Sequence, residues 1–418
     1  LMQVNEISRF PFDDGVENGR VVFMEDEIDP AFVRAVLKQA TPGSRDLSVV
    51  YTPLHGVGAT AVLPVLQGAG FQNVRLYGPQ AEPNGDFPNV PGHVANPENP
   101  EVLTGAIEEA RNRSDDVVMA SDPDCDRLGA AAALAPKKDS DWKTFTGNQL
   151  GALLAEWVLE TKRRQNVLQP TDTIVTTLVT SGLVRHIGEK YGLSVIDGLQ
   201  VGFKWIGRTI DDIGPEHFVF GCEESHGYLA GTHVRDKDAS VAALLLAELA
   251  AELKAQGRTL HQKLDDLFCI HGCHLERQVA IKLPGAAGMD RMREIMAGLR
   301  ANPPTELGGL AVRRTRDYGQ LKVHDPEQGE MPLKGEQGDL VIFDLLDPEG
   351  TGAKASGPLF PPLGNAVAAR PSGTEPKIKF YLFAVSQPMS AEALPAVKAA
   401  LERRLNLLEE DLRSRVGV

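Results

Sequence analysis

The chain has 418 residues, 42% of them apolar, and a formal net charge of -14, which fits an ordinary globular protein of about two to four domains. The acidic excess disfavours binding to nucleic acid or to anionic lipid, although a local cluster of Arg and Lys still attracts small anions. The longest apolar run, residues 241–247, is too short to span a membrane, and the four cysteines form no C-x-x-C pair, so we expect a cytoplasmic protein.

The first predicted elements form a βαβ unit. Residues 47–51 are a short β-branched run, and a Gly-rich turn leads from them into a helix at 59–67 and a second strand at 74–77. A polar loop and another helix precede a third strand at 116–120. We assign residues 1–145 to a first α/β domain.

A second region repeats this alternation. A helix runs to about residue 164, and three strands follow with helices between them; they are predicted at 173–179, 193–196 and 217–220. The long helix that comes next has Asp238 in position to cap its first turn. We assign residues 146–272 to a second α/β domain that is similar to the first.

Strands outnumber helices in the last part of the chain. They are predicted at 276–283, 310–315, 340–345, 365–369 and 378–385, with helices near 289–299 and from about 390. Residues 273–418 therefore read as a smaller α+β domain. The overall fold class is α/β, with two similar mixed α/β domains followed by this third one.

Asp122, Asp124 and Asp126 follow the strand at 116–120 directly. If the backbone stays extended there, alternate side chains point the same way and crowd three negative charges together. Hard oxygen ligands at the carboxyl end of an α/β strand suit Mg²⁺, and Arg127 comes immediately after them. The alternative is a solvated acidic turn.

A second stretch, R-P-S-G-T-E-P-K, begins at Arg370. Ser372, Gly373 and Thr374 supply hydroxyls and turn N–H groups that can form an anion-binding nest, and arginine adds a bidentate fork for phosphate. The alternative is an ordinary Pro/Gly turn with an arginine at its edge.

Several single residues have both a functional and a structural interpretation. Glu223 and Ser225 suit vicinal sugar hydroxyls, but a strand-to-helix loop with polar caps has the same composition. Ser181 is more typical of a helix cap than of a ligand. His55 is more typical of a packed residue or of a turn hydrogen bond than of a catalytic base. Lys204 either reaches a phosphate or extends its charged end to solvent over apolar neighbours.

These stretches occur together and in order. The acidic triplet, G-F-K, the E-x-S loop, V-R-D-K-D and R-P-S-G-T-E-P-K resemble the α-D-phosphohexomutase family, which includes phosphoglucomutases and phosphomannomutases. The resemblance implies four domains around a cleft, with the three regions here matching domains two, three and four, the last one similar to a TATA-box-binding protein. The family's first domain carries a T-A-S-H-N-P-like loop with a phosphorylated serine. This sequence contains no such string, so we expect the serine-bearing domain to be missing and this chain to be inactive alone.

The resemblance also implies a mechanism and residue roles. Phosphoserine donates its phosphoryl group to a hexose 1- or 6-phosphate, and the resulting 1,6-bisphosphate turns over and returns its other phosphate to serine. Glucose 1,6-bisphosphate is then the activator of the full-length enzyme. The implied Mg²⁺ ligands are Asp122, Asp124 and Asp126; the implied sugar contacts are Glu223 and Ser225; the implied phosphate contacts are Arg370, Ser372, Gly373, Thr374 and Lys204, with Arg127 in support. The general base, the role of His226 and the choice between glucose and mannose stay open.

Two other functions compete with this one. A haloacid-dehalogenase-type phosphatase also places a D-x-D motif after a buried strand, with its first aspartate as nucleophile, but it leaves R-P-S-G-T-E-P-K unexplained. A fragment that binds hexose phosphates without catalysis is the non-enzymatic alternative.

Overall fold

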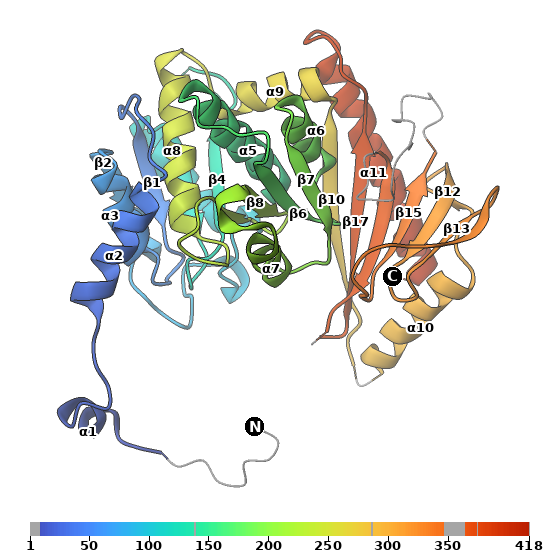
Figure 1. Cartoon of the computed structure of the whole chain (residues 1–418), viewed down its shortest axis with the longest axis horizontal. Coiled ribbons are helices and arrows are strands. Elements are labelled where there is room, and N and C mark those ends of the chain that lie inside the picture. Colours follow the sequence, from blue (N-terminus) through green and yellow to red (C-terminus); the bar gives the residue numbers. More distant parts are fainter. Residues whose placement is uncertain (1–8, 138, 286, 347–363, 374, 418) are drawn as a thin grey trace.

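The computed structural model describes residues 9–417 except 138, 286, 347–363 and 374. Three units lie side by side in chain order (Figure 1). Helix α1 (Phe12–Glu17) stands away from them on an N-terminal arm, which joins the first unit at α2 (Glu25–Leu37).

The first unit is a five-stranded sheet in the order β2-β1-β3-β4-β5. Strands β2, β1 and β3 are parallel, as the βαβ pattern predicted, and β4 and β5 add antiparallel strands that the sequence analysis missed. The elements are β1 (Ser48–Thr52), α3 (Ala59–Gly68), β2 (Asn73–Leu76), η1 (Gly78–Gln80), η2 (Pro91–His93), η3 (Pro100–Leu103), α4 (Thr104–Arg113), β3 (Val117–Ser121), β4 (Leu128–Ala133) and β5 (Trp142–Thr144).

The second unit repeats this topology in a four-stranded sheet, β7-β6-β8-β9. Its first three strands are parallel and β9 is antiparallel, so β6, β7 and β8 correspond to β1, β2 and β3. The elements are α5 (Gly147–Arg164), β6 (Thr173–Thr177), α6 (Gly182–Lys190), β7 (Ser194–Leu199), α7 (Phe203–Ile213), η4 (Pro215–His217), β8 (Phe218–Glu223), β9 (Gly227–Leu229), α8 (Ala239–Ala255) and α9 (Leu260–His271).

The third unit is an antiparallel sheet in the order β10-β17-β16-β15-β12-β13-β14, with β11 paired to β12. The predicted α/β fold class with a final α+β unit is thereby confirmed. The elements are β10 (His274–Lys282), α10 (Gly288–Ala301), β11 (Glu306–Leu307), β12 (Leu310–Asp317), β13 (Lys322–Asp325), β14 (Gly329–Pro332), β15 (Val341–Leu345), β16 (Ala366–Pro371), β17 (Lys377–Val385) and α11 (Leu394–Val416).

The units share one core. A continuous cluster of buried apolar side chains runs from the first sheet through α5 and α8 to α9, α10 and α11. On β16, Val367 and Ala369 belong to this cluster, whereas Ala366 and Ala368 pack into a second cluster on the other face, together with Leu178 of the second unit. Alternate residues of one strand therefore hold the third sheet against both its own helices and its neighbour.

Candidate metal and phosphate site

The three predicted metal ligands converge in a tight turn at the carboxyl end of β3. One oxygen from each of Asp122, Asp124 and Asp126 lies within 4.8 Å of the others, and within the described ranges no other trio of acidic, His or Cys side chains meets this condition. The extended backbone that we expected is wrong: Cys125 N donates to Asp122 O at 3.0 Å, and Cys125 has a φ of 60°. The carboxylates meet because the chain turns back on itself, not because side chains alternate along a strand.

Asp122 is the anchored member of the triplet. It is fully buried, and its Oδ1 accepts hydrogen bonds from the backbone N–H groups of Asp126 at 3.0 Å and Arg127 at 2.9 Å. Its Oδ2 accepts from Arg127 Nε at 2.6 Å. Burial by itself raises the pKa of Asp122, but the backbone and guanidinium of Arg127 outweigh it and lower the pKa, so this carboxylate stays ionised.

One carboxylate oxygen of Asp126 has an ion-pair contact, with Arg127 Nε at 3.6 Å, but no hydrogen bond in the described part of the chain. Lys237 Nζ lies 2.7 Å from its Oδ2, whereas its Oδ1 is buried and has no hydrogen-bond partner among the described residues. Burial, and then the charge of Asp122, raise the pKa of Asp126. A divalent cation would satisfy this oxygen and neutralise the crowded charge, and carboxylate oxygens are ligands that Mg²⁺ prefers. The three side chains therefore fit a magnesium ion.

A Gly-rich turn after β1 supports the acidic loop from behind. Val57 N donates to Pro123 O at 2.9 Å, and a β-carbon at Gly56 would lie only 2.1 Å from Pro123 Cα. At Gly58 it would lie 2.2 Å from Tyr51 Oη. The sequence predicts this turn but not its contact with the acidic loop. The G-V-G pattern after a buried strand could have indicated the contact, because glycine permits such close approach of two backbones.

Arg127 connects the acidic loop to its surroundings. Its Nη1 lies 3.0 Å from Glu98 Oε1, on the polar loop of the first unit, while its Nε holds Asp122. Arg127 also forms an isolated β-bridge with Gly227, and Leu128 N donates to His226 O at 3.0 Å. The acidic loop (residues 122–127) and the E-E-S loop of the second unit (residues 223–226, between β8 and β9) are thus joined through their backbones.

His226, whose role the sequence left open, is buried in this junction. Its Nε2 lies 3.3 Å from Phe145 O, and its backbone takes a left-handed φ of 67°. Burial lowers its pKa, so the ring is neutral at physiological pH. His226 thus connects the E-E-S loop to Phe145, between β5 and α5.

The predicted sugar ligands lie at the end of β8. Glu223 is 4% exposed, and its Oε1 accepts a hydrogen bond from Gly202 N at 2.8 Å; burial raises its pKa. Ser225 is half-buried two residues further on. Lys237, the one lysine of V-R-D-K-D, packs its alkyl chain against Gly227, where a β-carbon would lie 2.6 Å from Lys237 Cδ. We had given this lysine no role, although it links Asp126 to the E-E-S loop.

Lys204 lies in the first turn of α7 and is exposed. Its Nζ lies 5.3 Å from the centroid of the Trp205 ring, close enough for a cation–π contact. The hydrogen bond from Gly202 to Glu223 ties this G-F-K turn to the E-E-S loop. A phosphate contact by Lys204 stays a prediction.

The R-P-S-G-T-E-P-K stretch forms the hairpin between β16 and β17. Ser372 N donates to Lys377 O at 2.9 Å, and Glu375 N donates to Ser372 Oγ at 3.3 Å. Gly373 is exposed, Arg370 is half-buried, and Thr374 lies outside the described residues. These two bonds close the hairpin, and an anion-binding nest at its turn stays a prediction.

Tyr381, on β17 beyond this hairpin, is buried, and charged groups of other units influence it. Burial is the main reason why the pKa of Tyr381 is raised; the charges of Glu224 and Glu98 add to the rise, and Arg370 opposes it. Burial raises the pKa of Glu224 itself to about 8, and Lys379 of β17 is one of the charges that act on it. Charged groups of all three units thus act on the pKa of Tyr381 or of Glu224.

The protein thus has two α/β units, a cluster of three carboxylates at the carboxyl edge of the first sheet, and a Ser/Gly hairpin in a third, antiparallel unit. The family model described as phosphoglucomutase/phosphomannomutase, alpha/beta/alpha domain II, matches residues 30–134. The model for domain III matches residues 146–269. The chain belongs to the phosphoglucomutase/phosphomannomutase family.

Individual relatives agree with this assignment. A protein named "Probable phosphomannomutase" from Haemophilus influenzae is 31% identical over 380 residues, which cover 91% of this chain and 68% of that protein. A phosphoglucomutase from Staphylococcus haemolyticus is 33% identical over 341 residues, covering 81% of this chain and 57% of the relative. The chain thus spans just over half the length of the staphylococcal protein.

Solved structures show the same fold. A phosphoglucomutase/phosphomannomutase family protein from Burkholderia thailandensis superposes with a TM-score of 0.54 at 15% identity, covering 96% of this chain and 69% of that one. The open form of the phosphoglucomutase parafusin from Paramecium also superposes with a TM-score of 0.54, at 17% identity, and the match covers 97% of this chain and 63% of parafusin. In the part of the chain that the structure describes, no helix is long and apolar enough to cross a bilayer.

Proposed function

We propose that this chain forms the Mg²⁺ and hexose-phosphate site of a mutase that interconverts hexose 1-phosphate and hexose 6-phosphate. The observation that carries the proposal is the acidic turn, with three carboxylate oxygens within 4.8 Å and direct backbone contact to the E-E-S loop. A cation site beside a buried carboxylate loop suits a substrate that has both phosphate and hydroxyl groups.

In this proposal Asp122, Asp124 and Asp126 hold Mg²⁺, which when bound neutralises charge on a transferring phosphoryl group. Arg127 keeps Asp122 ionised and oriented, and Lys237 keeps Asp126 in place. These contacts fix the ligand set before substrate arrives, which is the preorganisation that phosphoryl transfer needs.

The remaining residues bind the substrate. Glu223 and Ser225 hold sugar hydroxyls, because a carboxylate accepts hydrogen bonds and a hydroxyl both donates and accepts. The phosphate that is not reacting is held by Arg370, Ser372, Gly373 and Thr374, with Lys204 as a further contact. A guanidinium and turn N–H groups suit a dianionic phosphate.

The phosphoryl donor in this proposal is a phosphorylated serine, and the intermediate is a hexose 1,6-bisphosphate. Because the sequence contains no T-A-S-H-N-P-like string, we expect the 418-residue chain to bind hexose phosphate without turning it over. A coupled assay with glucose 1-phosphate, glucose 1,6-bisphosphate and Mg²⁺ tests this. Measurable turnover by the purified chain would show that one of its own groups replaces the serine.

Calorimetric titration with Mg²⁺ tests the metal ligands. Asp124→Asn should lower the affinity for Mg²⁺ at least tenfold while the far-UV circular dichroism stays unchanged, because one ligand charge is lost from an exposed position. Asp29→Asn, an exposed aspartate on α2, is the control. Equal Mg²⁺ affinity in the two variants would remove Asp124 from the ligand set.

Titration with glucose 6-phosphate tests the hairpin of the third unit. Arg370→Ala should weaken binding by about 1.5–3 kcal/mol, the usual worth of a hydrogen bond to a charged group. Arg403→Ala, an exposed arginine on α11, should not change it. Unchanged affinity in Arg370→Ala would place the phosphate elsewhere.

A further inference from the structure

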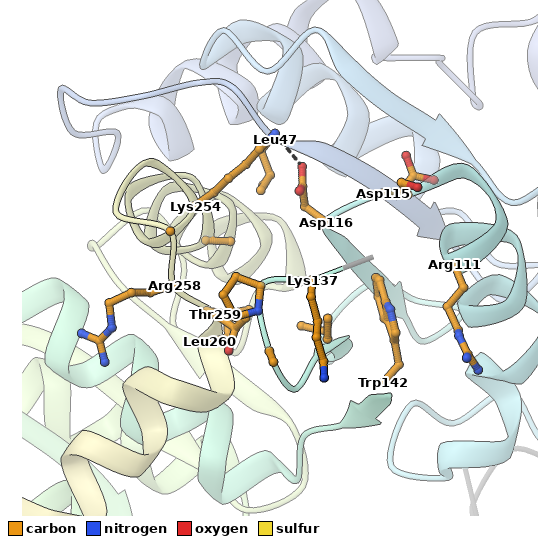
Figure 2. Close-up of a pocket in the computed structure, with 17 residues that line it drawn as sticks. Leu47, Arg111, Asp115, Asp116, Lys137, Trp142, Lys254, Arg258, Thr259 and Leu260 are labelled. Carbon is orange, nitrogen blue, oxygen red and sulfur yellow. Dashed lines mark hydrogen bonds and ion pairs between the residues drawn. The ribbon is translucent and has the colours of Figure 1, made fainter. Parts of the chain in front are cut away.

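We propose a second binding site in the first unit, for an aromatic or similarly apolar molecule that carries a phosphate group. It is a cavity of about 510 Å³ at the end of β3 opposite the acidic loop, between the first sheet and the α8–α9 connection (Figure 2). Asp116 lies just before β3 in this cavity, and Asp122 follows β3 at the other end. A volume of this size is typical of sites for small organic molecules.

One wall of the cavity is apolar. Leu47, Ala132, Pro136, Ala250 and Leu260 line it, and the half-buried ring of Trp142 joins them. These side chains come from the first sheet, from the β4–β5 loop and from the two helices that cover it. An indole with part of its surface uncovered offers a flat surface for a ring or an aliphatic body.

Four basic residues line the same cavity, and two of them have no acidic partner. Arg111 on α4 and Lys137 in the β4–β5 loop are exposed, and no carboxylate of the described residues lies within 4.0 Å of either. In Figure 2 the side chains of Arg111, Trp142 and Lys137 extend toward the same side of the cavity. Lys254 and Arg258 complete the basic set.

The acidic residues of the cavity are already compensated. Asp115 forms an ion pair with Arg75 at 2.6 Å, and its side chain is only 4% exposed. Asp116 accepts hydrogen bonds from Ser48 N at 2.7 Å and from Lys254 Nζ at 3.0 Å. Arg258 is paired with Asp266 at 2.5 Å. The charge left without a partner in the cavity is therefore positive, in a chain whose net charge is -14.

The first turn of α9 adds to this potential. Thr259 lines the cavity and caps α9 in a capping box with Gln262, so the cavity borders the positive end of a helix dipole. Together the groups suit a phosphate dianion attracted by Arg111 and Lys137, with the rest of the ligand against Trp142, which lies between these two side chains in Figure 2. Charge-assisted hydrogen bonds would supply the affinity, and the indole would supply the preference for a ring.

Phenyl phosphate is the probe that tests the site, and calorimetry and tryptophan fluorescence measure its binding. We expect phenyl phosphate to bind and to change the fluorescence of Trp142, inorganic phosphate to bind more weakly, and phenol to give no signal. The chain has three tryptophans, so a Trp142→Phe variant identifies the reporter. Absence of phenyl phosphate binding at millimolar concentration overturns the proposal.

Charge-reversal variants locate the binding. Arg111→Glu and Lys137→Glu should each lower the affinity for phenyl phosphate at least tenfold, whereas Arg403→Glu on α11 should not. Equal affinity for Mg²⁺ in all of them verifies that the variants fold. Binding that is lost in Arg370→Ala but kept in Arg111→Glu would place the probe in the proposed hexose-phosphate site and overturn the second site.

Discussion

Gly56 illustrates how a residue without a side chain decides where the acidic loop lies. Its α-carbon faces the backbone of Pro123 so closely that a β-carbon would lie 2.1 Å from Pro123 Cα, a contact with backbone that no rotamer change relieves. The turn after β1 and the loop after β3 are therefore in contact only because residue 56 is glycine.

Gly56→Ala should displace the acidic loop. We expect it to lower the free energy of unfolding by about 1–3 kcal/mol, the usual cost of overpacking, and to weaken Mg²⁺ binding at the same time. Gly78→Ala is the control, because no atom lies within 4 Å of the β-carbon it would add. Urea unfolding and Mg²⁺ calorimetry measure both effects; normal Mg²⁺ affinity in Gly56→Ala would show that the loop tolerates the shift.

The acidic triplet shows the limit of reasoning from residue spacing. The spacing of Asp122, Asp124 and Asp126 predicted convergence through an extended backbone, but the chain turns at Cys125. A turn was not readable from the letters, because its left-handed residue is a cysteine and not a glycine. Lys237 was missed for a related reason: its partner Asp126 is more than a hundred residues away in sequence.

At the scale of elements, helix starts were well predicted by local chemistry. Asp238 caps α8 by accepting from Ser240 N, as the sequence indicated, and Ser181 caps α6 by accepting from Leu183 N. Thr146 and Gln149 form a full capping box at α5. Caps depend on residues one to three positions apart, so they need no tertiary information.

Thr146→Ala should loosen the first turn of α5. Thr146 Oγ1 accepts a hydrogen bond from the backbone N–H of Gln149. Loss of a threonine cap costs about 1 kcal/mol, which corresponds to a roughly fivefold faster hydrogen exchange of that N–H group. Thr146→Ser keeps the hydroxyl and should exchange like the wild type. Hydrogen–deuterium exchange of this segment makes the comparison, and equal rates in both variants would assign the helix start to packing alone.

The antiparallel strands β4 and β5 were missed at this scale. β4 is the alanine-rich run Leu128–Ala133, and alanine has no preference for strands. It becomes a strand because β3 pairs with it over Val117–Ser121. Pairing with a neighbour thus overrides intrinsic propensity here.

At the scale of the whole molecule, three histidines meet where the second unit joins the third. His186 on α6 and His274 on β10 have ring centroids 5.3 Å apart, and His271 ends α9 three residues before His274. Burial lowers the pKa of His271 to about 4 and of His274 to about 3; burial also lowers the pKa of His186. Lys190 and Lys263 add to the effect at His271, and Glu189 opposes it at His186.

Acid should therefore weaken the junction. Between the unfolded pKa near 6.5 and the lower folded values, the unfolded chain binds protons that the folded chain does not, so stability is complete above pH 6.5 and falls as the pH decreases. From pH 7 to pH 5 the loss is about 2 kcal/mol for a histidine that stays neutral throughout. Calorimetric unfolding at pH 7 and at pH 5 measures this loss of stability. The loss should be smaller for His274→Gln than for the wild type. An equal loss in the two proteins would show that His274 does not contribute to the pH dependence.

The sequence alone determined most helices, the strands of the βαβ units and the motif stretches proposed for the site. Helix caps, the alternation of strands and helices in each βαβ unit and the acidic, E-E-S and R-P-S-G-T-E-P-K stretches all depend on residues a few positions apart, whose propensities and chemistry are readable in order. Only the tertiary structure decided how these stretches meet. The contact of Lys237 with Asp126, the close approach of Gly56 to Pro123 and the compensation of Asp115 and Asp116 in the second cavity all join segments far apart in the chain, because packing of a shared core places them.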